Sequence, residues 1–165
     1  MTIVVVFAVL LVIGSAYTTR AVDSTNGSMA PMFRIERQDS VVTLDQLKGQ
    51  WVLLTFWSSS DADSRIACNR YSRISQTLTL NDETNIPFRH IAINMDRSQK
   101  LFQEIVKHDR LDAKSQFHVA ESRANQLQRD YNLLSGMHSF LIAPNGKIVA
   151  KNPTEEHLTQ LTASF

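Results

Sequence analysis

Two patterns of apolar positions alternate along the chain from residue 51 onward. Residues 51–57 read WVLLTFW, a continuous apolar run that is typical of a strand buried on both faces. Residues 88–95 read FRHIAINM and have the β-branched, apolar character of a second central strand. Between them, apolar residues recur at spacings of four, three and four: Ala67, Tyr71, Ile74 and Leu78. This spacing places them on one face of a helix, so we predict a strand, a helix and a second strand.

The alternation continues toward the C-terminus in shorter elements. We predict a helix over residues 98–110, a short strand at 117–119, a helix through 120–131, strands at 139–143 and 147–151, and a last helix capped by Thr154. The last two strands flank Pro144-Asn145-Gly146, where Asn-Gly is expected to supply the positive φ angles of a tight hairpin.

Two shorter features precede the first long strand. Residues 41–44 are β-branched and short, and residues 45–49 predict a brief helical turn that ends at a glycine. Strands that alternate with helices and end in a hairpin and a helix predict an α/β domain. We expect a central mixed sheet covered by helices on both faces.

The first residues predict an export segment. Residues 3–13 read IVVVFAVLLVI, and the small residues Gly14 and Ala16 suit a signal-peptide cleavage site. We divide the chain into a signal peptide or membrane anchor over 1–21, a polar linker over 22–28 and a folded domain over 29–165. Cleavage and retention both stay open, because the apolar run is short for a bilayer crossing. Either outcome places the domain in the cell envelope, periplasmic or anchored on the extracytoplasmic side.

Composition excludes several classes of function. The chain has 165 residues, enough for one domain of ordinary size, and removing the first 21 residues leaves 16 basic and 16 acidic side chains. This balance gives no electrostatic case for a nucleic-acid partner. Cys68 is the only cysteine, so neither an intramolecular disulfide nor a cysteine metal cluster can form.

Six short segments, in this order and spacing, carry a resemblance to a known family. They are APMF at 30–33, VTLDQLKG at 42–49, WVLLTFW at 51–57, YNL at 131–133, SFLI at 139–142 and PNGKI at 144–148. Together they resemble the bacterial membrane-associated thioredoxin-like thiol-disulfide oxidoreductases, redoxins related to the AhpC/TSA peroxiredoxins. The resemblance covers residues 29–161 and implies a thioredoxin-like fold.

The chain departs from this family at its active site. The resemblance implies Cys-x-x-Cys after the Phe-Trp strand end, and counting from Trp57 places those two cysteines at Asp61 and Ser64. It also implies a cis-proline before the strand at 139–142, where Met137 stands instead. We therefore expect an ordinary trans peptide and an altered loop there. Dithiol–disulfide catalysis needs both sulfurs, so it is lost.

An acidic helix end replaces the redox motif. Asp61 or Asp63 suits an ordinary N-cap, and the sharper hypothesis is that Asp61 permanently imitates the charge of the family's thiolate. On this hypothesis the former active-site surface binds a protein or peptide partner, through Trp57, Asp61, Asp63, Met137 and His138.

Cys68 carries the competing enzymatic hypothesis. It falls two turns into the predicted helix, where we expect a half-buried structural thiol. The alternative function is a residual single-cysteine oxidoreductase or peroxiredoxin-like activity through this thiol. A third possibility is a structural envelope protein, for which changes at Asp61, Met137 and His138 would be silent.

The sequence predicts neither a metal nor a cofactor. The histidines form no close pair of the metal-binding kind: His90, His108, His118, His138 and His157. His118 and His138 each fall near a strand end and could converge with Asp61. The serines at 58–60 and Ser64 have no identifiable base and suit ordinary capping.

Overall fold

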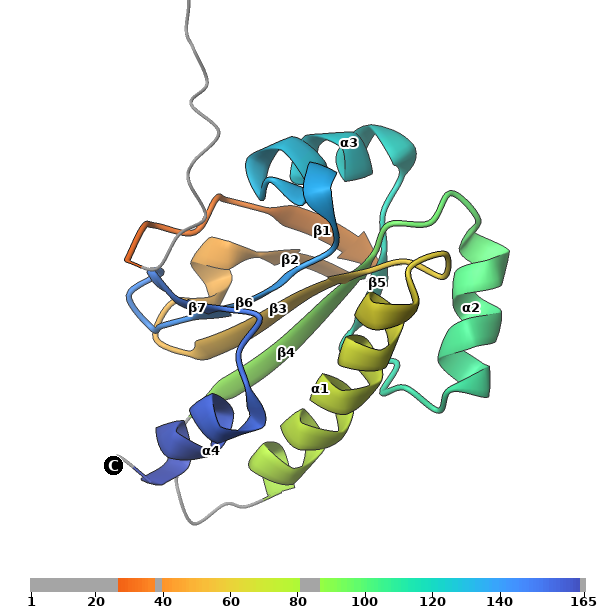
Figure 1. The fold of residues 1–165 in the computed structure, drawn as a ribbon. Helices are drawn as coiled ribbons and strands as arrows, with labels where there is room; N and C mark the ends of the chain where they lie inside the picture. The colour runs from red at the N-terminus through yellow and green to blue at the C-terminus, as the bar shows by residue number, and fades with distance from the viewer. Residues whose placement is uncertain (1–26, 38–39, 81–86, 164–165) are drawn as a thin grey trace, which may run out of the picture.

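The computed structural model describes residues 27–37, 40–80 and 87–163 (Figure 1). The predicted export segment, and the linker up to residue 26, lie outside the described residues. Among the helices that the structure describes, none is both long and apolar enough to cross a membrane.

The core of the fold is a five-stranded mixed sheet in the order β5-β4-β3-β6-β7. Its strands are β3 (Trp51–Trp57), β4 (Phe88–Asn94), β5 (Gln116–His118), β6 (Ser139–Ile142) and β7 (Ile148–Lys151). The first three are parallel to one another, and β6 and β7 each pair antiparallel with their neighbours. The predicted mixed sheet is therefore confirmed.

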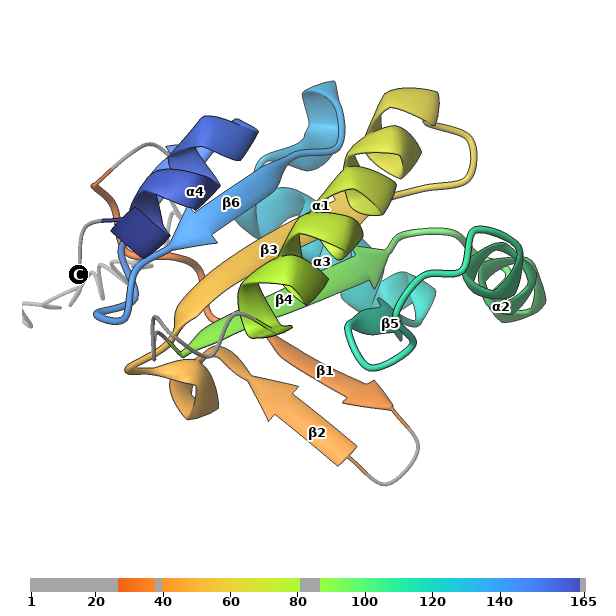
Figure 2. The ribbon, with the colours of Figure 1, turned by 90° about the horizontal axis from the view of Figure 1, so that it is seen from below.

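Helices cover both faces of this sheet, as predicted. Figure 2 shows α1 (Ala62–Leu80) and α4 (Glu155–Ala163) on one face and α3 (Glu121–Asp130) on the other. The remaining described helix, α2 (Gln99–His108), lies beyond β5 at the edge of the sheet.

A small antiparallel sheet of β1 (Arg34–Arg37) and β2 (Ser40–Thr43) was predicted only in part. β2 lies within one residue of the expected strand, whereas β1 was not foreseen, because Ile35 is its one fully buried side chain. The brief helical turn expected at 45–49 is present as a short 3-10 helix, η1 (Leu44–Leu47), followed by a turn that ends at Gly49.

The apolar run of β3 is buried on both sides, and alternate residues enter different parts of the core. Val52, Leu54 and Phe56 pack with the side chains of α3 and the β1–β2 sheet. Leu53 joins Tyr71 and Leu158 beneath α1 and α4. This two-sided burial explains why the run lacks polar residues other than one threonine.

The turn between β6 and β7 corrects one prediction. Gly146 has a φ of +83°, but Asn145 is not among the residues with positive φ, so the two-residue turn expected from Asn-Gly does not form. The Gly146 N–H donates to Ala143 O at 2.8 Å, and the Ala143 N–H donates to Lys147 O at 2.8 Å. This pattern is a turn followed by a glycine bulge, which needs only one residue with positive φ.

Candidate functional site

The N-terminus of α1 lies directly after β3, where the resemblance places the redox motif. Asp61 Oδ1 accepts a hydrogen bond from the Ser64 N–H at 3.0 Å, so Asp61 is the N-cap of α1. The Ser64 hydroxyl donates to Asp61 O at 2.9 Å and accepts from the Ser58 N–H at 3.2 Å. The two positions expected to carry sulfur in the family therefore close the first helical turn with hydrogen bonds. Asp63 is exposed in the same turn.

A second carboxylate, Asp96, fixes the loop that leads into α1. It accepts hydrogen bonds from the Ser58 hydroxyl at 2.8 Å, from the Ser59 N–H at 3.0 Å and from Asn94 Nδ2 at 2.9 Å. Partial burial alone would raise the pKa of Asp96, but these hydrogen bonds outweigh it and lower the pKa. The sequence analysis did not identify Asp96. Because β3 and β4 end beside each other, with Trp57 opposite Asn94, residues that follow the two strands are expected to meet.

The loop before β6 faces this helix end. The His138 carbonyl accepts from the Phe56 N–H at 3.0 Å, and no described peptide bond is cis, so the trans loop expected at Met137 is confirmed. Met137 is half-buried against the core. Partial burial and Lys151 lower the pKa of the His138 imidazole, while hydrogen bonding to Asn152 and the charge of Asp61 oppose that shift.

Trp57 corrects the predicted binding surface. Its side chain is fully buried, its Nε1 donates to Gln116 Oε1 at 3.2 Å, and its ring centroid lies 6.1 Å from that of Phe102. A partner cannot touch it. The register of β3 explains this, because Trp57 points beneath α1 and α2 rather than out of the strand end.

Cys68 is also more buried than predicted. The thiol is fully inaccessible rather than half-buried, and its Sγ lies 3.7 Å from Gln116 Oε1. Burial raises the pKa of Cys68 to about 12, and the hydrogen bond between the thiol and Gln116 Oε1 opposes the shift. A thiol of this kind is protonated at neutral pH and has no path to a substrate.

The two histidines expected to converge with Asp61 behave differently from each other. His138 is close enough for the charge of Asp61 to act on it. His118 instead donates from Nε2 to Asp96 O at 2.9 Å, with its ring centroid 5.5 Å from that of Phe102. Among the described residues, no three histidine, cysteine, aspartate or glutamate side chains are grouped so as to hold a metal ion.

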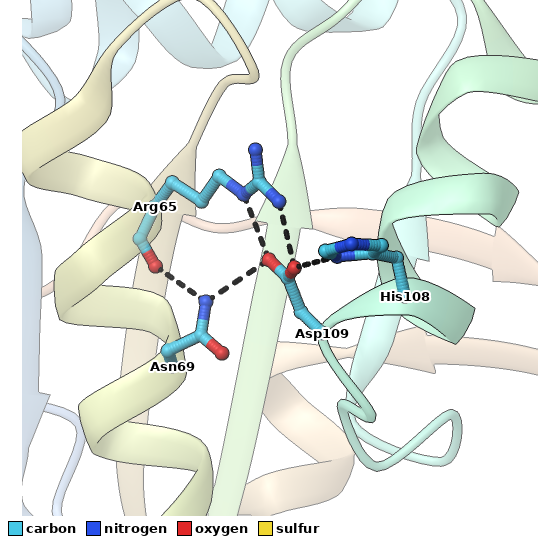
Figure 3. A network of polar contacts seen from close by, with 4 residues as sticks. All are labelled: Arg65, Asn69, His108 and Asp109. Carbon is cyan, nitrogen blue, oxygen red and sulfur yellow. Dashed lines mark hydrogen bonds and ion pairs between the residues drawn. The ribbon is translucent and has the colours of Figure 1, made fainter.

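An ion pair joins the start of α1 to the end of α2 (Figure 3). Arg65 donates from Nε and Nη2 to the two oxygens of Asp109, at 2.7 and 2.6 Å, and Asn69 Nδ2 donates to the same carboxylate at 3.2 Å. His108 Nδ1 lies 2.9 Å from Asp109 Oδ1. The hydrogen bonds from Arg65 hold the pKa of Asp109 well below its ordinary value, so this anchor persists across the neutral range.

Comparison with known proteins agrees with this architecture. A sequence model of the AhpC/TSA family matches residues 26–151, which is most of the chain. The chain belongs to the AhpC/TSA family. No curated protein matches this AhpC/TSA domain.

Solved structures share the fold of this AhpC/TSA domain. A thioredoxin-like protein from Parabacteroides distasonis is 27% identical with a TM-score of 0.67, over 84% of this chain and 97% of that one. The thioredoxin domain of a thiol-disulfide oxidoreductase from Bacteroides vulgatus is 24% identical with a TM-score of 0.67, over 86% and 97%. A thiol:disulfide interchange protein from a Bacteroides species is 22% identical with a TM-score of 0.70, over 86% and 90%. The fold is thus thioredoxin-like.

Proposed function

We propose that this protein is a redox-inactive thioredoxin-like domain that binds a protein or peptide partner. The partner contacts the helix-end surface, which we define as Asp61, Asp63, Met137 and His138. The observation that carries the proposal is the N-cap bond of Asp61. A carboxylate holds the place expected for the family's nucleophile, and the chain's one thiol is buried elsewhere.

Charge and exposure on this surface favour a partner with a positive segment. Asp61 and Asp63 place two carboxylates at the N-terminus of α1, and both are at least partly accessible. Ile66, on the next turn, is 64% exposed and adds an apolar contact beside them. A peptide that carries lysine or arginine next to an apolar side chain matches both features.

Export is the second part of the proposal. The apolar run at residues 3–13 and the small residues after it support a domain that acts in the cell envelope, periplasmic or anchored by this segment if it stays uncleaved. Such a location leaves the domain accessible to partners in the same compartment.

The charge of Asp61 can be tested apart from its capping role. Asn caps helices about as well as Asp, so Asp61→Asn removes the charge and keeps the hydrogen bond, at a cost of only a few tenths of a kcal/mol. With a photo-crosslinking residue at Ala62, we expect Asp61→Asn to lower adduct yield from native membranes about threefold, and Asp61→Lys to lower it about tenfold or more.

Two comparisons make this result decisive. A crosslinker at Gln126, which is exposed on α3 across the sheet, should give adducts that do not depend on residue 61. Equal adduct yields at Ala62 from the wild type, Asp61→Asn and Asp61→Lys would contradict the proposal. That outcome would favour a purely structural role.

A further inference from the structure

A cavity separate from the helix-end surface is lined by residues of α2, of β5 and of the loop that joins them. Figure 2 shows α2 and β5 at this edge of the sheet. Its volume is about 750 Å³, within the range of small-molecule sites. None of Asp61, Asp63, Met137 and His138 lines it. We call it the α2 cavity, and its ligand is independent of the partner proposed above.

Apolar side chains form one wall of the α2 cavity. Phe102 and Val106 project from α2, and Leu111 follows that helix; all three belong to the cluster that also holds Trp57. The buried amide of Gln116 also lines the cavity, with its Oε1 occupied by the Trp57 indole N–H. This wall suits the apolar body of a ligand.

The rest of the lining is strongly basic. Four cationic side chains border the cavity: Arg37, Lys107, Arg110 and Lys114. Among the described residues of the lining, Glu36 is the one carboxylate, and it lies 3.1 Å from Arg34, which is not in the lining. In a chain with 17 basic and 16 acidic residues, this local excess of positive charge is not a reflection of composition.

Three of these cations are exposed. Among the described residues, Lys107, Arg110 and Lys114 take part in no ion pair. Arg37 differs, since its Nη1 donates to Ala113 O at 2.5 Å. An anion in the cavity would therefore bind these cations without breaking an existing ion pair.

Arg110 occupies a backbone position that ordinarily favours glycine. The Arg110 N–H donates to Lys107 O at 3.3 Å and the Leu111 N–H donates to Val106 O at 3.0 Å, which together form a Schellman motif at the end of α2. Arg110 has a φ of +54°, in the left-handed region. An arginine in this backbone conformation is strained, whereas a glycine would not be. We therefore expect the Arg110 side chain to have a role other than stabilising the fold.

We propose that the α2 cavity binds a small organic anion, with an apolar body against Phe102, Val106 and Leu111 and a carboxylate or sulfonate held by Arg110 and Lys114. The apolar wall supplies affinity and the cations select for negative charge. The strained Arg110 is explained as a ligand-binding residue that lowers the stability of the free protein.

Two fluorescent probes with the same ring system test this proposal. Anilinonaphthalene sulfonate is anionic, and N-phenylnaphthylamine is its neutral counterpart without the sulfonate. We expect the wild type to bind the sulfonate more tightly. Arg110→Gly should weaken sulfonate binding about tenfold and leave the neutral probe unchanged. The same variant should raise the midpoint of thermal unfolding, because glycine relieves the strain.

Conservative variants separate charge from shape. Arg110→Lys keeps the charge and should retain sulfonate affinity within about twofold, and Arg129→Ala, on α3 and outside the cavity, should have no effect. Unchanged sulfonate affinity in Arg110→Gly would overturn the proposal. An equal loss for both probes would also overturn it, since Arg110 would then act through the fold rather than through charge.

Discussion

Cys68 in the folded protein should react with an aromatic disulfide reagent about a thousandfold more slowly than in the unfolded chain. The reactive species is the thiolate. Burial raises the pKa of Cys68 from 9.0 to about 12, so the thiolate fraction at about pH 8 falls about a thousandfold. Complete burial slows the reaction further. The measurement is the rate of thiol release at about pH 8, with and without denaturant.

The Cys68→Ser variant fixes the background rate in this assay. Because the chain has one cysteine, all specific reaction belongs to that residue. A folded-state rate within about tenfold of the unfolded rate would contradict the burial of the thiol. It would also revive the single-cysteine enzyme as the better hypothesis.

Acid should weaken the fold between pH 6.5 and about pH 4 through His90. His90 lies in β4 beneath α1, with Nε2 3.2 Å from Thr55 Oγ1, and its Nδ1 finds no hydrogen-bond partner in the described part of the chain. Burial lowers its pKa from 6.5 to about 4, partly opposed by Asp112. As the pH falls through 6.5, the unfolded chain takes up a proton that the folded protein does not. The free energy of unfolding should therefore fall by about 3 kcal/mol across this window.

Denaturant titrations at several pH values measure this loss. His90→Gln cannot take up the proton, so its free energy of unfolding should fall much less over the same window, with the lowered pKa of His138 still contributing to the remaining loss. His157→Gln, an exposed residue at the start of α4, is the matched control and should behave as the wild type does. An unchanged pH dependence in His90→Gln would contradict the assignment. Proton NMR titration of the His90 ring tests it without a substitution.

The sequence predicted most of the long elements of the fold because their apolar patterns are local. The unbroken apolar run at 51–57 indicated a strand buried on both faces, and the spacing of Ala67, Tyr71 and Ile74 indicated α1. β1 was not predicted, because four residues with one buried side chain do not form a recognisable pattern. The prediction of a two-residue Asn-Gly turn was wrong, because a turn with a glycine bulge closes the hairpin with one residue of positive φ.

The site was harder to predict because it depends on which face each residue occupies. Asp61 as N-cap follows from local sequence, whereas the burial of Trp57 depends on the register of β3 against α1 and α2. Asp96 meets Ser58 across two strands that are separated by a whole helix in the chain. The positive φ of Arg110 could not be predicted, because sequence patterns for a helix C-terminus expect glycine at such a position.

We propose that this AhpC/TSA-family chain does not perform thiol–disulfide chemistry. The most direct measurement is turnover of a protein disulfide and of hydrogen peroxide in the presence of a dithiol reductant, comparing the wild type with Cys68→Ser. We expect both proteins to match the rate without enzyme. Turnover by the wild type that is abolished in Cys68→Ser would contradict the account.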